Sequence, residues 1–165
     1  MNHGSRISLL EAEPDLAALM SAEERAAARA VSVPVRRIAR GPVELQPLLT
    51  EADAFGALIL DGILFSHHRI GDHTALRLLG PGDLVALAGP GRATILSAAA
   101  VSAAAPTAVA LLGSELLLAA RRWPRFMAGF HVRMAEQSDR VVAQLTICQF
   151  SRVDQRLLAM MWPPT

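Results

Sequence analysis

The chain has 165 residues and a mass of 17.6 kDa, which suits one domain, with or without an appendage, and allows a sizeable core. Apolar residues make up 52% and charged residues 19%, proportions that exclude an intrinsically disordered chain. The net charge of +1 gives no electrostatic footprint for nucleic acid. Because Cys148 is the only cysteine, an internal disulfide, a four-cysteine zinc site and a four-thiolate iron–sulfur cluster are also excluded.

Targeting signals are not evident in the sequence. Residues 1–10 lack the hydrophobic segment of a secretory signal. The uncharged stretch Ala93–Ser114 is long enough for a membrane span, but it consists mostly of small residues and contains Pro106, so short buried strands explain it better. We therefore expect a cytoplasmic protein with no membrane partner.

The first region is predicted to be short and helical. Pro14–Met20 predicts one or two helical turns. Ser21 and Glu24 have the spacing of a capping box, in which each side chain accepts a hydrogen bond from the other residue's main-chain amide. We expect a surface helix from there to about Ala30.

Residues 31–112 contain short apolar runs separated by glycine- and proline-rich turns. Several short strands at close intervals predict an antiparallel sandwich or barrel rather than a parallel sheet. The apolar runs on either side of Asp61-Gly62 predict a hairpin with a tight turn. The predicted strands span residues 55–60, 63–65, 74–79, 84–88, 95–105 and 108–112.

The third region is predicted to be helical. Ser114 is expected to cap a helix over Glu115–Arg122, which Pro124 ends. From Arg125 to Phe150, apolar residues recur at steps of three, four and seven, which predicts one long helix with a narrow apolar seam. This helix would extend about 37 Å, so we expect the seam to pair with the same helix of a second copy; packing of the whole seam on its own domain is the alternative. The predicted dimer interface is Met127, Phe130, Met134, Gln137, Ser138, Val141, Leu145 and Cys148, with Gln137 and Ser138 as its polar break.

Three segments resemble the Crp/Fnr family of transcription regulators. Residues 78–84 (LLGPGDL) resemble the turn before that family's effector pocket, residues 105–112 (APTAVALL) its last strands, and residues 150–158 (FSRVDQRLL) the hinge after its dimer helix. The resemblance implies a mainly β fold with flanking helices: a cyclic-nucleotide-binding-like antiparallel β-roll (jelly roll) and a long C-terminal dimerisation helix. It implies a sensor domain over 14–122, a dimerisation helix over 125–150 and a hinge, the start of a winged helix-turn-helix domain, over 151–165. Within this hinge, apolar residues independently predict a short helix over Arg152–Trp162.

The same resemblance implies a function. The chain would be the effector-sensing and dimerisation half of a bacterial transcription regulator, a homodimer that reaches DNA only through a C-terminal winged helix-turn-helix domain outside this chain. We expect no enzymatic activity, because nucleophile-elbow, phosphate-loop and zinc-protease motifs are missing from the sequence. An effector in the β-roll would shift the long helix and so reorient the part of the protein that follows Phe150.

The resemblance also places the effector pocket. Its members here are Gly82, Asp83, Leu84, Arg92, Ser97, Ala98, Val141 and Val142. The family's nucleotide-binding members hold the cyclic phosphate and ribose with an Arg-Ser pair and a glutamate; here Ser97-Ala98 replaces the pair and the glutamate is missing. Val141-Val142 replaces the polar pair that touches the base. Burying a phosphate without a paired cation is costly, so we expect no cyclic AMP binding of the usual kind unless Arg92 reaches the site through a shifted loop.

Three alternatives remain: a haem sensor, a redox sensor and a stand-alone ligand-binding module. A haem sensor would need an axial histidine, but His67 and His68 point to opposite faces of a strand, His73 lies in a turn and His131 lies on the long helix. Redox sensing would use a disulfide between the two copies of Cys148 in the dimer. We expect Cys148 instead to be a small, buried apolar residue of the dimer seam. A stand-alone jelly roll of the cupin kind would need a His/Glu metal set that we cannot assemble. We therefore predict no metal and no cofactor.

Overall fold

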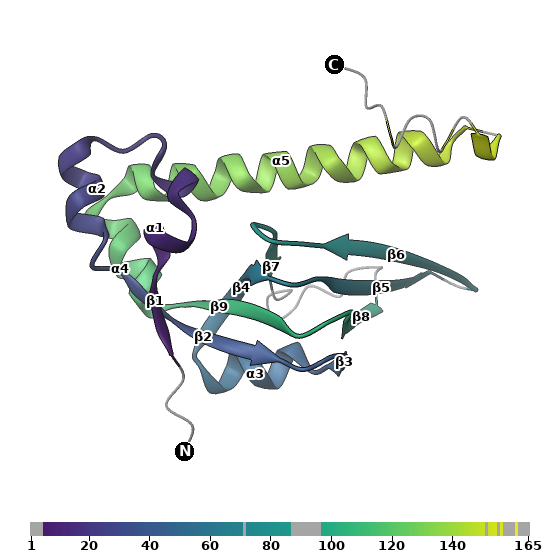
Figure 1. Ribbon diagram of the computed structural model, residues 1–165, viewed down its shortest axis with the longest axis horizontal. Coiled ribbons are helices and arrows are strands. Elements are labelled where there is room, and N and C mark those ends of the chain that lie inside the picture. The colour runs from purple at the N-terminus through teal and green to yellow at the C-terminus, as the bar shows by residue number, and fades with distance from the viewer. Residues whose placement is uncertain are drawn as a thin grey trace.

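The computed structural model describes residues 5–70, 72–86, 97–150, 152–154, 156 and 161, without the side chains of 69, 70, 73, 86 and 97–99. Within this part of the chain, nine antiparallel strands form two sheets, ordered β1-β2-β9-β4-β7 and β3-β8-β5-β6, and a long helix follows them (Figure 1). The predicted fold class is thereby confirmed. The strands are β1 (Arg6–Ser8), β2 (Ser32–Ile38), β3 (Gly41–Val43), β4 (Ala54–Asp61), β5 (Leu64–Ile70), β6 (His73–Leu79), β7 (Leu84–Ala86), β8 (Ser97–Ala103) and β9 (Thr107–Gly113).

The apolar runs of β4 and β9 reflect burial on both faces of the five-stranded sheet. On β4, Leu58 packs with the helices, whereas Ala57 and Ile59 face the core between the sheets. On β9, Ala110 and Leu112 likewise face the helices, and Val109 and Leu111 face the other sheet. Each run is continuous because neither side of these strands faces water.

The predicted hairpin at Asp61-Gly62 is wrong. The strands that flank it, β4 and β5, pair with other strands and belong to different sheets. Gly62 has φ +89°, and a Cβ there would lie 2.7 Å from Thr107 Cα, so glycine is needed where the chain crosses between the sheets. The hairpin is formed instead by β5 and β6, from Leu64 opposite Leu79 to Ile70 opposite His73.

The helices are α1 (Leu9–Ala12), a 3₁₀ turn η1 (Pro14–Ala17), α2 (Ala22–Ala28), α3 (Leu45–Glu51), α4 (Ser114–Arg122) and α5 (Pro124–Cys148). The capping box at the start of α2 is confirmed, with Ser21 N donating to Glu24 Oε2 at 2.8 Å and Glu24 N donating to Ser21 Oγ at 3.2 Å. Ser114 is not a cap, because Gly113 occupies the N-cap of α4 and Ser114 is its first residue. The sequence did not indicate α3. Most of the predicted helix Arg152–Trp162 lies outside the described residues.

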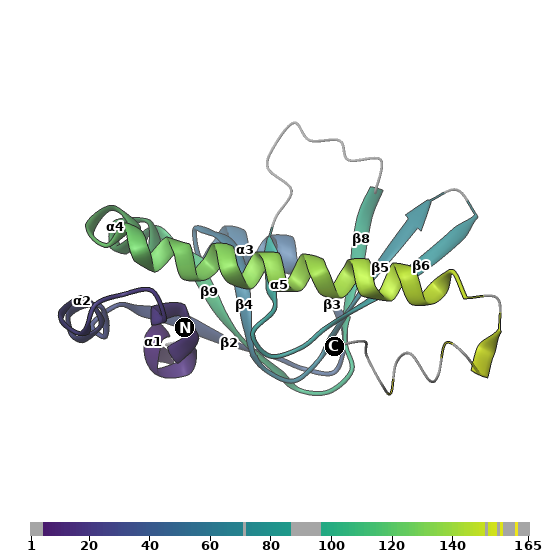
Figure 2. The same ribbon diagram turned by 90° about the horizontal axis from the view of Figure 1, so that it is seen from above.

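The long helix α5 has two environments. Its first half lies among α1, α2 and α4, and its second half continues over the four-stranded sheet (Figures 1 and 2). Phe126 and Phe130 are buried in the helix-side core, with ring centroids 5.6 Å apart in an edge-to-face arrangement. Leu9 and Leu10, which precede the predicted domain start at Pro14, belong to the same core.

None of the helices in the described residues has the length and apolar character that a bilayer-spanning segment requires.

Candidate functional site

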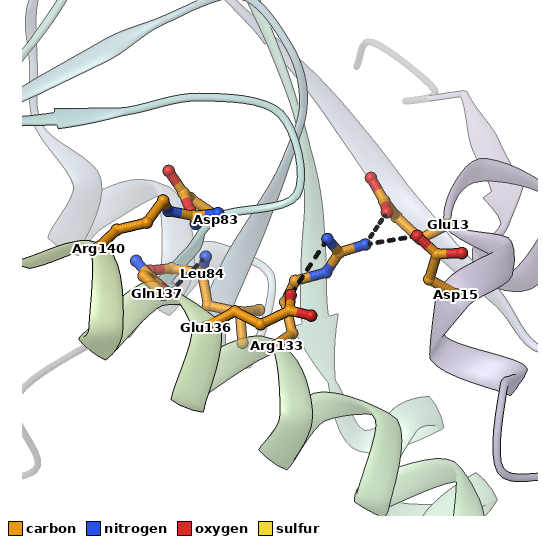
Figure 3. Close-up of polar contacts among 8 residues, drawn as sticks. All are labelled: Glu13, Asp15, Asp83, Leu84, Arg133, Glu136, Gln137 and Arg140. Atoms are coloured by element: carbon orange, nitrogen blue, oxygen red, sulfur yellow. Dashed lines mark hydrogen bonds and ion pairs between the residues drawn. The ribbon is translucent and has the colours of Figure 1, made fainter. Parts of the chain in front are cut away.

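Three polar residues of α5 dock on the start of β7 and on the N-terminal helices. Arg133, Gln137 and Arg140 are spaced by four and three residues, so they share one face of the helix. Figure 3 shows this polar junction, in which the helix meets Asp83 and Leu84 on one side and Glu13 and Asp15 on the other. The junction fixes the position of α5 against the β-roll.

Gln137 binds the main chain of β7. Leu84 N donates to Gln137 Oε1 at 3.2 Å, and Gln137 Nε2 donates to Leu84 O at 3.0 Å. The strand is at the edge of its sheet, and its inner side is bonded to β4 through Ile59 N to Asp83 O at 3.0 Å. Both polar groups of Leu84 therefore face away from the sheet, and the amide of Gln137, which is 7% exposed, takes the place of a missing strand.

Asp83 joins the turn before β7 to the helix. Its Oδ2 accepts a hydrogen bond from Gly80 N at 2.9 Å, and its Oδ1 is paired with Arg140 Nη2. The side chain of Asp83 is nearly buried, whereas that of Arg140 is half exposed. Asp83 caps a main-chain amide, as aspartates beside turns commonly do, and it also holds α5.

Arg133 ties the N-terminal helices to α5. Its Nη2 lies 2.8 Å from Glu13 Oε2 and 3.5 Å from Asp15 Oδ2, and its Nη1 lies 3.7 Å from Glu136 Oε2. Burial raises the pKa of Glu13 above its ordinary value of 4.5, against the opposing charge of Arg133 and with a small contribution from Asp15. One partly buried arginine thus serves three carboxylates from two parts of the chain.

A cavity of about 280 Å³ lies beside this junction. The β6–β7 side supplies Arg77, Leu78, Gly80, Pro81 and Asp83, and α5 supplies Gln137, Arg140, Val141 and Gln144. Its lining combines two cations and two amides with apolar side chains, and one of the cations is paired with Asp83.

The effector-pocket residues predicted from the sequence are only partly brought together. Asp83 and Val141 line the cavity. Gly82 and Leu84 flank Asp83 in the turn and strand. Val142 does not line the cavity and is 60% exposed, because one residue along a helix turns the side chain by about 100°. Arg92 lies outside the described residues, as do the side chains of Ser97 and Ala98, whose backbone begins β8.

The predicted dimer interface is divided between two surroundings. Met134 is 54% exposed and Leu145 60% exposed; Ser138 and Cys148 are also exposed, and Val141 is partly exposed. The structure contradicts the prediction for Phe130 and Gln137, because Phe130 is buried in the protein's own core and Gln137 is bonded to its own β7. Met127 packs against the same core. The exposed apolar stripe therefore begins at Met134.

The histidines of β5 have separate hydrogen-bond partners. His67 Nε2 lies 3.0 Å from Ser102 Oγ on β8, and His68 Nε2 lies 3.0 Å from Ser66 Oγ on its own strand. Their different partners agree with side chains on opposite faces. His131 is exposed on α5, and the side chain of His73 lies outside the described residues. Among the described residues, no three His, Cys, Asp or Glu side chains are grouped to hold a metal ion.

Sequence reasoning did not identify the polar junction. The apolar pattern placed Gln137 in the predicted dimer seam and gave Arg133, Arg140 and Gln144 no role. The signal was present in the spacing, because residues 133, 137, 140 and 144 are separated by four, three and four and so share one face. What the sequence did not show is that this face meets the unpaired edge of β7.

The fold has counterparts among solved structures, although neither a protein-family model nor a curated protein sequence matches this chain. A CooA mutant from Carboxydothermus hydrogenoformans superposes with a TM-score of 0.55 at 12% identity, over 92% of this chain and 96% of that one. The catabolite activator protein of Thermus thermophilus gives 0.49 at 20% identity, over 81% and 62%. The N-terminal domain of a Streptomyces coelicolor A3(2) transcriptional regulator gives 0.45 at 16% identity, over 81% and 93%. CooA is a Crp/Fnr regulator, and its likeness shows that this chain has the cyclic-nucleotide-binding-like fold with a long C-terminal helix.

Proposed function

We propose that this protein is the effector-sensing and dimerisation part of a Crp/Fnr-type transcription regulator that acts in the cytoplasm as a homodimer, without enzymatic activity. DNA binding would belong to a winged helix-turn-helix domain beyond residues 151–165, which would act as the hinge. The fold shared with CooA supports the assignment at a general level.

One observation carries the proposal: from Met134 onward, α5 has an apolar stripe that its own domain leaves uncovered. Met134 and Leu145 are more than half exposed, and Val141 lies between them at a spacing of seven and four residues. Apolar side chains at these spacings are typical of two-stranded helix packing. A second copy related by a twofold axis would bury the stripe against itself.

In this proposal the cavity between β6 and α5 is the place where an effector acts. Its contacts with Gln137 and Arg140 lie on the helix that carries the dimer stripe. We keep the expectation that cyclic AMP does not bind there in the usual way, because Ser97-Ala98 and Val141-Val142 stand where polar and cationic groups are required. Isothermal titration with cyclic AMP and cyclic GMP tests this point, and micromolar binding of either would contradict it.

The native Cys148 allows a direct test of the dimer. If two α5 helices pair in parallel along the proposed stripe, Cys148 would face its counterpart across the interface, within reach of a disulfide. Mild oxidation should therefore produce a covalent dimer on a non-reducing gel. The matched control is C148S/A143C, which moves the thiol to an exposed position on the opposite side of α5. Equal cross-linking of both proteins would contradict the proposed stripe.

A further inference from the structure

The main-chain groups of Leu84 face away from β4, and in the described residues no strand lies beyond β7. An edge strand in contact with a helix needs a donor and an acceptor for each such residue. The primary amides of Asn and Gln offer both in one planar group at neutral pH, and Gln has the longer reach. Position 137 satisfies both groups of Leu84, at 3.2 Å and 3.0 Å, in a nearly dry environment.

We propose that Gln137 is the positioning residue that couples β7 to α5, so that the placement of the strand and that of the helix cannot change independently. Because the contact is to the main chain, it follows the position of the strand itself, regardless of which side chain stands at 84. Movement of β7 by more than a fraction of a hydrogen-bond length would break both bonds together.

The position of Gln137 on α5 gives this coupling a consequence for the dimer. At about 100° per residue, Met134 and Leu145 lie roughly 60° and 80° around the helix from Gln137. The docking face and the apolar stripe are therefore adjacent, and a small rotation of α5 about its axis would alter both. The coupling of β7 to the dimer stripe rests on the proposed function, whereas the hydrogen-bonding role of Gln137 does not.

Amide hydrogen exchange at Leu84, followed by NMR in the full chain, tests the hydrogen-bonding role. In Q137M, which keeps the volume and loses both polar groups, exchange at Leu84 should become at least about fivefold faster than in the wild type. The control Q149M makes the same change at an exposed position at the end of the same helix and should leave this rate unchanged. An unchanged rate in Q137M would overturn the proposal.

The variant Q137E adds a second test, in which lowering the pH should restore slow exchange at Leu84. A side chain that only filled space would not show this pH dependence. An ionised Glu has two acceptors and no donor, so at pH 7 a carboxylate oxygen would face the Leu84 carbonyl. Repulsion between these two oxygens should move the side chain away from β7, which breaks the bond from Leu84 N as well and makes its exchange fast. A protonated Glu has one donor and one acceptor, so slow exchange should return near pH 4, after correction for the intrinsic pH dependence. The charged groups around this position are Arg133, Glu136 and Arg140 on α5, Asp83 before β7, Arg77 on β6, and Glu13 and Asp15 through Arg133. The wild type and Q137M over the same pH range control for their titration. A Q137E protein without this rescue would contradict the two-way bond.

The coupling to the dimer is tested by oxidative cross-linking of Cys148. Q137M should change the cross-linking rate by about fivefold or more relative to Q149M. Fivefold is the lower end of the effects that coupling between two sites typically has. An equal rate in both would overturn the coupling. If the wild type itself forms no cross-linked dimer, the proposed function fails, and the exchange rate at Leu84 still decides the role of Gln137.

Discussion

The first part of α5, up to Phe130, and the part from Met134 onward both carry large apolar residues, but their surroundings are opposite. In the first half Phe126 is 0% exposed and Phe130 4%, whereas in the second half Val142 and Leu145 are each 60% exposed. The first half packs into the helix-side core, and the second half contacts the β-roll through the polar face that carries Gln137 and Arg140. An apolar side chain therefore has a different role at the two ends of one helix.

This difference shows how one helix can serve both folding and assembly. The first half contributes to the stability of the monomer, because its side chains are removed from water within the chain. The second half is positioned by hydrogen bonds and ion pairs, which leaves its apolar stripe free for a second copy. The following substitutions test that division, beginning with the largest expected effect.

Truncation of a buried ring should have the largest effect. Phe126→Ala removes a fully buried side chain and its edge-to-face partner contact, and should lower the free energy of unfolding by about 3–5 kcal/mol. Leu145→Ala in the exposed half should change the stability of the monomer by less than about 0.5 kcal/mol. Urea unfolding, performed where both proteins are monomeric, measures both. Similar losses for the two variants would remove the distinction between the halves.

An added methyl group at Gly129 should have an intermediate effect on stability, and it should destabilise the protein where Gly→Ala in a helix usually stabilises. Gly129→Ala would ordinarily stabilise a helix interior by about 1 kcal/mol. Here the new Cβ would collide with the main chain of Leu16, 2.9 Å from its Cα, so we expect a net loss of about 1–3 kcal/mol. Gly80→Ala, where nothing lies within 4 Å of the new Cβ, is the control. A gain in melting temperature for Gly129→Ala would show that α5 and η1 are not closely packed.

The smallest expected effect is the pH dependence of the contribution that Glu13 makes to the free energy of unfolding. Because burial raises the pKa of Glu13 above 4.5 in the folded protein, the folded state binds this proton more tightly than the unfolded state. The stability of the wild type relative to Glu13→Gln should therefore rise as the pH falls from 7 through the folded pKa, and level off below about 4.5.

Glu115 supplies a control with the opposite sign. The hydrogen bond from Arg6 lowers the pKa of Glu115, so the wild type should lose stability relative to Glu115→Gln as the pH falls from 4.5 through the lowered value. Unfolding curves over a pH series measure both differences. The same sign for both residues would contradict the burial of Glu13.

The elements with local rules could be predicted from the sequence, and those set by distant contacts could not. The Ser21–Glu24 capping box depends on two residues three apart, and the strands β4 and β9 on uninterrupted apolar runs. The Asp61-Gly62 turn has the composition of a hairpin, but the pairing of β4 with β9 and of β5 with β8 determines its geometry. For the site, the polar face of α5 was visible as a spacing, whereas its partner, the free edge of β7, appears only when the sheet order is known.

The central claim is that a second copy of the chain covers the exposed half of α5. Sedimentation equilibrium over a range of concentrations tests it most directly, with the wild type, Val141→Glu, Leu145→Glu and the control Ala143→Glu on the opposite side of the helix. We expect the wild type and Ala143→Glu to have twice the 17.6 kDa mass of the chain. The two seam variants should dissociate to 17.6 kDa, because a dimer would bury two like charges against each other. A monomeric wild type, or seam variants that remain dimers, would contradict the account.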